Sequence, residues 1–449
     1  MDTKKKGFPA AFWVCACTEI FERLAYYLGR SLILIFVTAS VATGGLGLSD
    51  TVAANMQSNL TAFSYLLPLF GAVIVDKYIG ARYTTPVGMF IAAAGYFTGG
   101  IAKSSAGVYA MIFLVSLGLA LFKNGAIIGR VITDKSQMDP AFSMRYTLVN
   151  VGAFIGTFLV GILYKDVFAK DGVLGFAPCF KMAALMMVLG GLWYIFVCWR
   201  FLGDLGKLPF KKTLTEEEKA AEAKKKEETG TKQPLTTIEK KRIGAIFVAS
   251  LFSIVFWIFW YLGYMPVYFY WAENMDWVVA GYQVPSTWFD AANSLFCVIL
   301  GPVTAALWKK LAARPQGDMS LFRKTGLGIA IIGVGYLFYA AIDIMRGGEK
   351  ASVLWLIVFA FLLTMGEMFF SPLGHSFISK YSPSRYLAVM MSVWGFATFI
   401  AAKSYGPVYG LLFGGKIEFK VACIGVAVVS FAAALIMIAL DKKLSALVD

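Results

Sequence analysis

The sequence predicts an all-α polytopic membrane protein, and three observations lead to this prediction. Of the 449 residues, 59% are hydrophobic and 15% are charged, whereas soluble proteins carry about 25% charged residues. Apolar runs recur along the chain and are long enough to cross a bilayer, which takes roughly 20 residues. One polar stretch, residues 202–240, interrupts the series. We therefore expect about 12 transmembrane helices, arranged as two six-helix bundles.

Hydropathy places about six spans on each side of the polar stretch, to within a few residues at each end. The first six cover roughly 10–42, 52–76, 83–102, 107–131, 142–166 and 178–201. The second six cover roughly 242–271, 285–311, 322–345, 352–380, 385–413 and 418–440. The predicted parts are an N-terminal six-helix bundle at 1–201, a cytoplasmic linker at 202–241 and a C-terminal six-helix bundle at 242–449. The core of the linker, 215–232, has no apolar stripe, so it is compatible with a solvated helix or a disordered segment.

The formal net charge of +14 is compatible with a nucleic-acid partner or with a membrane topology signal. Because the basic residues fall mostly in short loops between apolar runs, we interpret them as the positive-inside pattern and expect no nucleic acid. This pattern predicts cytoplasmic termini and a multi-pass protein of the plasma membrane, which in a bacterium is the inner membrane. The six cysteines show no metal or haem spacing, and no nucleophile–base pair or phosphate loop indicates an enzyme.

The first apolar run carries a group of ionisable side chains, Glu19, Glu22, Arg23 and Arg30. Successive helix residues are about 100° apart, so these side chains and that of Tyr26 share one face. Charged side chains in mid-span are costly and are usually retained for a function. A buried structural ion network is the alternative, but an apolar helix would pack equally well without the charges. The stripe therefore predicts a functional site in a wet cavity or against other polar helices.

The connection between the second and third predicted spans, residues 71–82, has the spacing G…D-K-x-x-G-x-R. Its defining residues are Gly71, Asp76, Gly80 and Arg82. The glycines permit a tight turn and close helix approach, and Asp76 can hold basic groups and a helix N-terminus in one conformation. An ordinary charged loop is the alternative. The full spacing resembles the cytoplasmic loop motif of the major facilitator superfamily, whose transporters also have two six-span halves joined by a linker.

Short segments in both halves resemble motifs of the proton-dependent oligopeptide transporters, a family within that superfamily. Residues 19–27 resemble the pattern E-x-x-E-R-F-x-Y-Y, with Leu24 in place of phenylalanine. The other matching segments, in chain order, are Leu121-Phe122-Lys123-Asn124, Asn150-Val151-Gly152-Ala153-Phe154, Phe256-Trp257, Asn293 with Pro302 and Leu307-Trp308, Gly366-Glu367-Met368-Phe369-Phe370-Ser371-Pro372-Leu373-Gly374, and Trp394. The resemblance implies the major facilitator fold and a proton-coupled symporter that imports di- and tripeptides by alternating access.

The resemblance implies no cofactor besides the transported proton, and it implies peptides, protons and the lipid bilayer as partners of a monomer. Two alternatives stay open. One is a related carrier of another small anion or peptide-like compound, because the wider family includes such members. Glu19, Glu22 and Glu367 argue against a simple anion carrier. The other is a nutrient sensor that binds its ligand without transporting it.

A peptide is a zwitterion, so its site needs one group for the ammonium and another for the carboxylate. Glu367 is the only acidic residue in the tenth apolar run, and we expect it to bind the ammonium. Arg30 and Lys123, from the other half, are the expected partners of the carboxylate. The other expected substrate contacts are Tyr26, Tyr65, Asn150, Asn293, Ser371 and Trp394. For the tyrosines, asparagines and tryptophan, helix packing or interhelical hydrogen bonding is the alternative role.

Proton coupling needs a group that gains and loses a proton during the transport cycle. Glu19 and Glu22 are expected to alternate in this way. A carboxylate beside Arg23 or Lys123 is held ionised, and separation from that partner in a dry site favours its neutral form.

The seventh span departs from the family pattern, because no acid follows Phe256-Trp257. The resemblance implies that such an acid would meet Arg30 when the outer gate closes. Arg30 therefore lacks its usual partner, and Asp290 in the eighth span is a candidate substitute.

Overall fold

The computed structural model describes residues 7–132, 137–209, 235–315, 319–383 and 386–448. Internal contacts divide the chain into two compact units. The first comprises Met1–Leu48 and Leu66–Leu214, and the second comprises Ser49–Tyr65 and Thr215–Asp449. The boundary after Leu214 falls inside the predicted linker, whose core at 215–232 lies outside the described residues.

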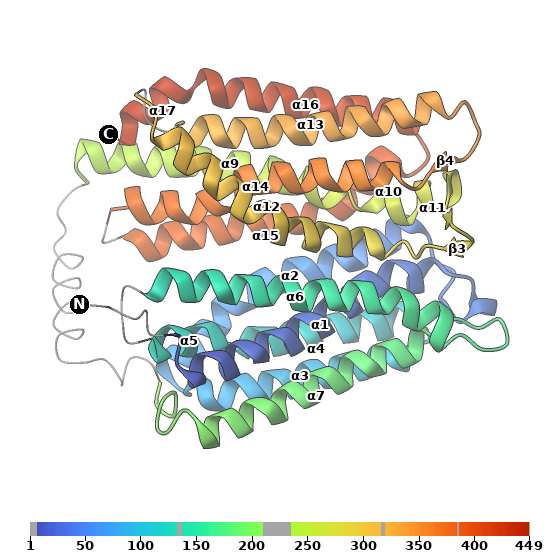
Figure 1. The fold of residues 1–449 in the computed structure, drawn as a ribbon, viewed down its shortest axis with the longest axis horizontal. Coiled ribbons are helices and arrows are strands. Elements are labelled where there is room, and N and C mark those ends of the chain that lie inside the picture. The colour runs from blue at the N-terminus through green and yellow to red at the C-terminus, as the bar shows by residue number, and fades with distance from the viewer. Residues whose placement is uncertain (1–6, 133–136, 210–234, 316–318, 384–385, 449) are drawn as a thin grey trace. The chain divides into compact units, whose positions relative to one another are not determined.

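The first unit consists of long helices joined by short connections, coloured from blue to green in Figure 1. Its elements are α1 (Ala10–Thr38), η1 (Val41–Thr43), the later part of α2 (Asp50–Lys77), α3 (Ala81–Gly100), α4 (Ser105–Leu121), α5 (Asn124–Val131), α6 (Met138–Ile162), the short π-helix η3 (Leu163–Val167) and α7 (Phe176–Arg200). α1 packs against α6 and α7, and α3 packs against α4 and α7. α7 therefore joins two helix pairs into one bundle.

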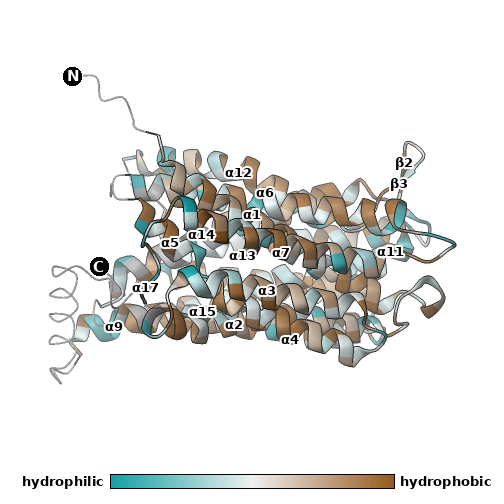
Figure 2. Cartoon of the chain, turned by 90° about the horizontal axis from the view of Figure 1, so that it is seen from below, coloured by the Kyte–Doolittle hydropathy of each residue, from teal (hydrophilic) through white to brown (hydrophobic). Residues whose placement is uncertain are grey.

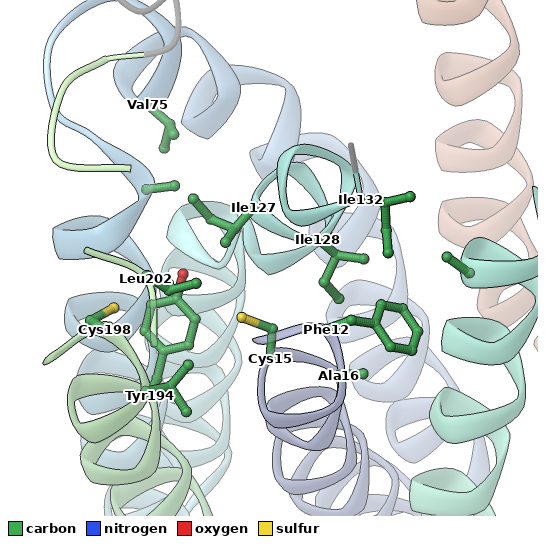
Figure 3. Close-up of a cluster of buried hydrophobic side chains, with 13 residues drawn as sticks. Phe12, Cys15, Ala16, Val75, Ile127, Ile128, Ile132, Tyr194, Cys198 and Leu202 are labelled. Atoms are coloured by element: carbon green, nitrogen blue, oxygen red, sulfur yellow. The ribbon is translucent and has the colours of Figure 1, made fainter. Parts of the chain in front are cut away.

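A buried apolar cluster forms the core of this unit at the end where α1 begins (Figure 3). Phe12, Cys15 and Ala16 of α1 contribute to it. The other labelled members are Val75, Ile127, Ile128, Ile132, Tyr194, Cys198 and Leu202. Full burial of one large aliphatic or aromatic side chain stabilises a fold by about 1.5–3 kcal/mol. The charged stripe of α1 begins at Glu19, one turn after this apolar core.

The second unit is also a bundle of long helices (Figure 1). Its helices are α9 (Thr237–Leu262), α10 (Met265–Tyr268), α11 (Tyr270–Asn274), α12 (Trp288–Ala312), α13 (Leu321–Met345), α14 (Trp355–Tyr381), α15 (Leu387–Phe413), α16 (Phe419–Ala439) and α17 (Asp441–Val448). α13 packs against α14 and α16, α9 against α15, and α12 against α14. Two strand pairs lie in the connections: β1 (Met275–Asp276) is parallel to β4 (Ala351–Ser352), and β2 (Val278–Val279) is antiparallel to β3 (Tyr282–Gln283).

The first part of α2 belongs by its contacts to the second unit. The Ser58 hydroxyl donates to the Ala402 carbonyl of α15 at 2.6 Å, and the Lys403 carbonyl lies 3.0 Å from the same hydroxyl. Gly406 permits this approach, because a Cβ there would lie 2.9 Å from the Ala54 carbonyl oxygen. α2 therefore contributes to both units. The predicted bundle at 1–201 instead places the whole of this helix in the N-terminal half.

The prediction of an all-α polytopic membrane protein is confirmed. The predicted spans correspond to α1, α2, α3, α4 together with α5, α6, α7, α9, α12, α13, α14, α15 and α16. In the described part of the chain, 7 helices are long and apolar enough to cross a membrane, and Ser105–Leu121 and Trp355–Phe370 are shorter apolar helices. Figure 2 shows that hydrophobic residues dominate the long helices. The chain is a multi-pass membrane protein.

Two boundaries differ from the prediction for local reasons. The fourth span is broken, because Phe122 and Lys123 are not helical and separate α4 from α5. α9 begins inside the predicted linker, because Thr236 and Glu239 form a capping box. The Thr236 hydroxyl accepts from the Glu239 N–H at 3.2 Å, and the Glu239 carboxylate accepts from the Thr236 N–H at 2.9 Å. Such a polar cap starts a helix before its apolar run begins.

Candidate functional site

The charged face of α1 lies inside the first unit. The Glu22 side chain is 0% exposed, whereas that of its partner Arg23 is 26% exposed. Arg23 Nη2 donates a hydrogen bond of 2.6 Å to Glu22 Oε1, and Arg23 Nε donates to Oε2, so the pair is bidentate. The guanidinium also lies 5.0 Å from the centroid of the Tyr26 ring, whose face attracts a cation. Glu22 therefore forms its ion pair with the next residue of the chain, Arg23.

Glu19 is also buried, and its partners come from two other helices. Arg145 Nε on α6 donates to Glu19 Oε1 at 2.9 Å, and Asn124 Nδ2 at the start of α5 donates to the same oxygen at 3.2 Å. The Asn124 amide also donates to the Cys15 carbonyl at 2.8 Å, which ties it to α1. Hydrogen bonds of this charged kind are roughly twice as strong as neutral ones. Arg145 is a site residue that the sequence analysis missed.

Two glycines of α6 explain how Arg145 reaches α1. A Cβ on Gly152 would lie 2.9 Å from the Ile20 carbonyl oxygen, and a Cβ on Gly156 would lie 2.5 Å from the Leu24 carbonyl oxygen. Glycine therefore permits an approach of α6 to α1 that a side chain would prevent. Arg145 precedes Gly152 by about two helical turns and faces the same neighbour. The position of a basic residue two turns before the N-x-G glycine was the available sequence signal for Arg145.

Lys123 occupies the break between α4 and α5. Its ammonium donates to the Pro68 carbonyl of α2 at 2.9 Å. Within the described part of the chain, Lys123 is not among the groups that hydrogen-bond to Glu19 or Glu22, and Arg145 instead approaches Glu19. The role of Lys123 in proton coupling and substrate binding stays a prediction.

The remaining predicted residues of the first unit are Tyr26, Arg30 and Asn150. Tyr26 and Arg30 are buried on α1. Asn150 Nδ2 donates to the Tyr146 carbonyl at 3.0 Å, one turn earlier in α6. This local bond does not decide whether the Asn150 carbonyl oxygen meets a substrate, so its role stays a prediction.

In the second unit, the buried Glu367 of α14 faces α12. Asn293 Nδ2 donates to Glu367 Oε2 at 3.2 Å and to the Thr364 hydroxyl at 2.9 Å. The Cys297 thiol approaches the same carboxylate oxygen at 3.8 Å. Both donors are neutral, as is the Trp260 indole, which also interacts with this carboxylate. No lysine or arginine of the described residues pairs with Glu367. A buried carboxylate is costly unless a cation or a proton compensates its charge, so Glu367 can receive either one.

An aromatic stack lies near this carboxylate. The Phe370 ring stacks on Phe256 of α9 with a centroid distance of 4.0 Å and on Trp394 of α15 with one of 6.0 Å. Trp394 lies over Gly374, where a Cβ would overlap the indole ring. The last glycine of the tenth-span motif therefore provides the space for the tryptophan. Ser371 lies on the same helix, but its side chain is outside the described part of the structure.

Two further polar pairs occur in the second unit. Tyr65 is 43% exposed and accepts a hydrogen bond of 3.2 Å from the hydroxyl of Tyr261, which stands in the acid-free stretch of the seventh span. Asp290, near the start of α12, is buried and accepts a hydrogen bond from Tyr268. Arg30 belongs to the other unit, so its pairing with Asp290 stays a prediction.

The predicted connection at 71–82 is shorter in the structure, because α2 continues to Lys77 and α3 begins at Ala81. Gly71 therefore lies inside α2, and the whole segment is closely packed within the first unit. A Cβ on Gly71 would overlap the Ala120 carbonyl oxygen, and a Cβ on Gly80 would overlap the Gly206 carbonyl oxygen. The two motif glycines therefore bring this connection against the end of α4 and the segment after α7. The Asp76 side chain lies outside the described part of the structure, and its predicted role stays untested.

The fold is shared with solved transporter structures. A crystal structure of peptide transporter POT in complex with sulfate has a TM-score of 0.86 at 23% sequence identity, covering 99% of this chain and 97% of that chain. A POT family transporter in complex with 5-aminolevulinic acid has a TM-score of 0.85 at 24% identity, covering 98% of both chains. These similarities show the major facilitator fold.

The sequence comparisons extend over most of the chain. A transporter of Bacillus subtilis (strain 168), the uncharacterized YclF, is 25% identical over 439 residues, which are 89% of this chain and 87% of that protein. The di-/tripeptide transporter of Lactococcus lactis subsp. cremoris is 24% identical over 440 residues, or 86% of each chain. The POT family model matches residues 205–413. The chain therefore matches the POT family model over this segment and is similar to transporters over most of its length. The family and these relatives are transporters, not enzymes.

Arg82 connects the end of α7 to the start of α3. Its Nη2 donates to the Cys198 carbonyl at 2.6 Å, its Nη1 donates to the Gly203 carbonyl, and its backbone N–H donates to the Gly206 carbonyl at 3.1 Å. Cys198 lies in the last turn of α7, where helix carbonyls lack an intrahelical donor. Arg82 therefore serves as a side-chain cap for this helix end.

We expect Arg82→Ala to lower the unfolding free energy by about 1–2 kcal/mol, because the Cys198 and Gly203 carbonyls lose their donor. Thermal unfolding of the purified protein in detergent measures the change. Lys77→Ala removes an exposed cation of the same connection and is the matched control, for which little change is expected. Equal effects of the two substitutions would contradict a capping role for Arg82.

Among the residues that the structure describes, no group of three or more histidine, cysteine, aspartate and glutamate side chains is placed to hold a metal ion. The polar groups of the two units instead combine carboxylates, arginines and amides, a chemistry suited to binding charged ligands and exchanging protons.

Proposed function

We propose that this chain is a proton-coupled symporter that imports di- and tripeptides by alternating access. The observation that carries the proposal is the buried Glu367, whose polar neighbours Asn293, Cys297 and Trp260 are neutral and which has no cationic partner among the described residues. A substrate ammonium would supply the missing charge. Two relatives support the substrate class: the di-/tripeptide transporter of Lactococcus lactis and the peptide transporter YePEPT of Yersinia enterocolitica.

The proposal gives each end of the peptide its own charged group. Glu367 binds the ammonium, and Arg30 and Lys123 bind the carboxylate. The proposed contacts to the peptide amides and side chains are Tyr26, Tyr65, Asn150, Asn293, Ser371 and Trp394. The aromatic stack of Phe370 and Trp394 offers an apolar surface that tolerates different side chains.

The proposed driving proton is carried by Glu19 and Glu22. Each is buried and paired with an arginine in this structure, and the proposed proton uptake accompanies separation of that pair. Arg23 and Lys123 are proposed to act with them. The motif at 71–82 is proposed to couple the ends of α2 and α3 during the conformational change. Its residues are Gly71, Asp76, Gly80 and Arg82.

The proposed setting is the plasma membrane, the inner membrane of a bacterium, with both termini in the cytoplasm. Residues 1–201 and 242–449 are proposed as the two halves that alternate, joined by a cytoplasmic linker at 202–241. A monomer is the proposed functional state.

Uptake into proteoliposomes with an inward proton gradient tests the function. The panel contains dialanine, trialanine, N-acetyl-dialanine, 5-aminolevulinic acid and nitrate. We expect dialanine and trialanine to accumulate above their external concentration, and a protonophore to abolish this accumulation. Accumulation of nitrate in place of the peptides would indicate an anion carrier, and peptide binding without transport would indicate a sensor.

A further inference from the structure

Cys297 differs from the other cysteines of the chain in the acceptor of its thiol. All six are free, and the structure describes each of them. Among these six, Cys297 is the one whose thiol donates to a carboxylate, at 3.8 Å from Glu367 Oε2. The resemblance to known motifs includes Asn293 and Glu367 but does not include Cys297, so its position requires a separate explanation.

The geometry divides the Glu367 carboxylate into two different oxygens. Oε2 receives both donors of α12, the Asn293 amide at 3.2 Å and the Cys297 thiol at 3.8 Å. Asn293 and Cys297 lie four residues apart on α12 and therefore on the same face of that helix. The buried indole N–H of Trp260 on α9 also interacts with this carboxylate. Oε2 is thus the oxygen that α12 holds.

The surroundings of Cys297 orient its thiol toward this carboxylate. Cys297 belongs to a buried apolar cluster with Leu300 and Met368, against which Phe296 and Met365 pack. The side chains of this cluster are apolar, and the Cys297 thiol donates to the Glu367 carboxylate at 3.8 Å, although a thiol is a weak donor.

We propose that Cys297 is a positioning residue for Glu367. Together with Asn293 it holds Oε2 against α12, which fixes the orientation of the carboxylate and so sets the preference of the transporter for peptides with a free ammonium group. This inference rests on the proposed function, in which Glu367 binds the ammonium. A thiol suits the role because it supports the carboxylate without supplying the positive charge that the substrate must bring.

The test compares Cys297→Ala with Cys297→Ser in proteoliposomes. The measured quantity is the ratio of KM for N-acetyl-dialanine to KM for dialanine. Loss of one weak donor to a charged group should raise the KM for dialanine about threefold to tenfold in Cys297→Ala, with little change for N-acetyl-dialanine. Cys297→Ser keeps a donor and should retain the preference. Cys423→Ala, a buried cysteine of α16, is the matched control and should behave like the wild type.

Three outcomes would overturn the inference. An unchanged ratio in Cys297→Ala would show that the thiol does not position Glu367. An equal loss for both substrates would show a packing role, because a positioning effect on the ammonium partner spares a blocked peptide. Equal behaviour of Cys297→Ser and Cys297→Ala would show that hydrogen-bond donation is irrelevant.

A double substitution separates this inference from the proposed function. If Cys297 acts through Glu367, adding Cys297→Ala to Glu367→Gln should cause no further change. The double variant should then show the same ratio of KM for N-acetyl-dialanine to KM for dialanine as Glu367→Gln alone. If Glu367→Gln leaves the preference intact, the proposed function of Glu367 fails. If Glu367→Gln removes the preference and Cys297→Ala does not, only the inference about Cys297 fails.

Discussion

Glu22→Gln should abolish accumulation of dipeptides against a gradient while leaving exchange of substrate across the membrane. Glu22 is buried and held in a bidentate pair by Arg23, so in the proposed cycle it binds a proton only when that pair opens. Glutamine has nearly the same shape but cannot gain or lose a proton. Exchange needs no net proton movement, so the conformational change can continue. Uptake under an imposed pH gradient and counterflow, measured in the same proteoliposomes, distinguish the two activities.

Glu19→Gln should have the same effect if the two glutamates titrate as one coupled pair, since the proton then belongs to the pair. Glu239→Gln is the matched control: Glu239 lies in the capping box of α9, where glutamine is also accepted. Parallel loss of exchange and accumulation would indicate a structural ion pair. Intact accumulation in both single variants and in the double variant would remove these residues from the mechanism.

Glu367→Gln should raise the KM for dialanine by about 30-fold or more and change the KM for N-acetyl-dialanine much less. Leaving a buried charge without its partner commonly costs about 2–5 kcal/mol, and each 1.4 kcal/mol is about a tenfold change in affinity. The amide of the variant can still accept from Asn293, so the local packing should persist. Counterflow with each of the two substrates gives the two KM values.

The control for this substitution is Glu418→Gln. Glu418 forms an exposed ion pair with Lys420 at 3.0 Å, and exposed pairs of this kind contribute little. An equal loss of affinity for the free and the blocked peptide would contradict an ammonium-binding role for Glu367. It would instead indicate that the hydrogen bonds from α12 stabilise the helix packing of the second unit.

Much of the fold follows from features that act along one helix at a time. Hydropathy placed the long helices because a run of apolar residues needs no knowledge of its neighbours. The helical repeat placed Glu19, Glu22 and Tyr26 on one face of α1, and all three are buried there. The glycines at 152 and 374 were recognisable from their motifs, although the sequence did not show what approaches each of them.

The partners across helices were decided by the tertiary structure alone. Arg145 pairs with Glu19 across 126 residues, and Cys297 reaches Glu367 across 70. The contacts of Ser58 with α15 assign the first part of α2 to the second unit. The periodicity of a helix determines which face is polar, but the opposing side chain depends on the approach of a second helix. That approach is set by close-packed glycines and apolar clusters from distant parts of the chain, so local sequence cannot specify it.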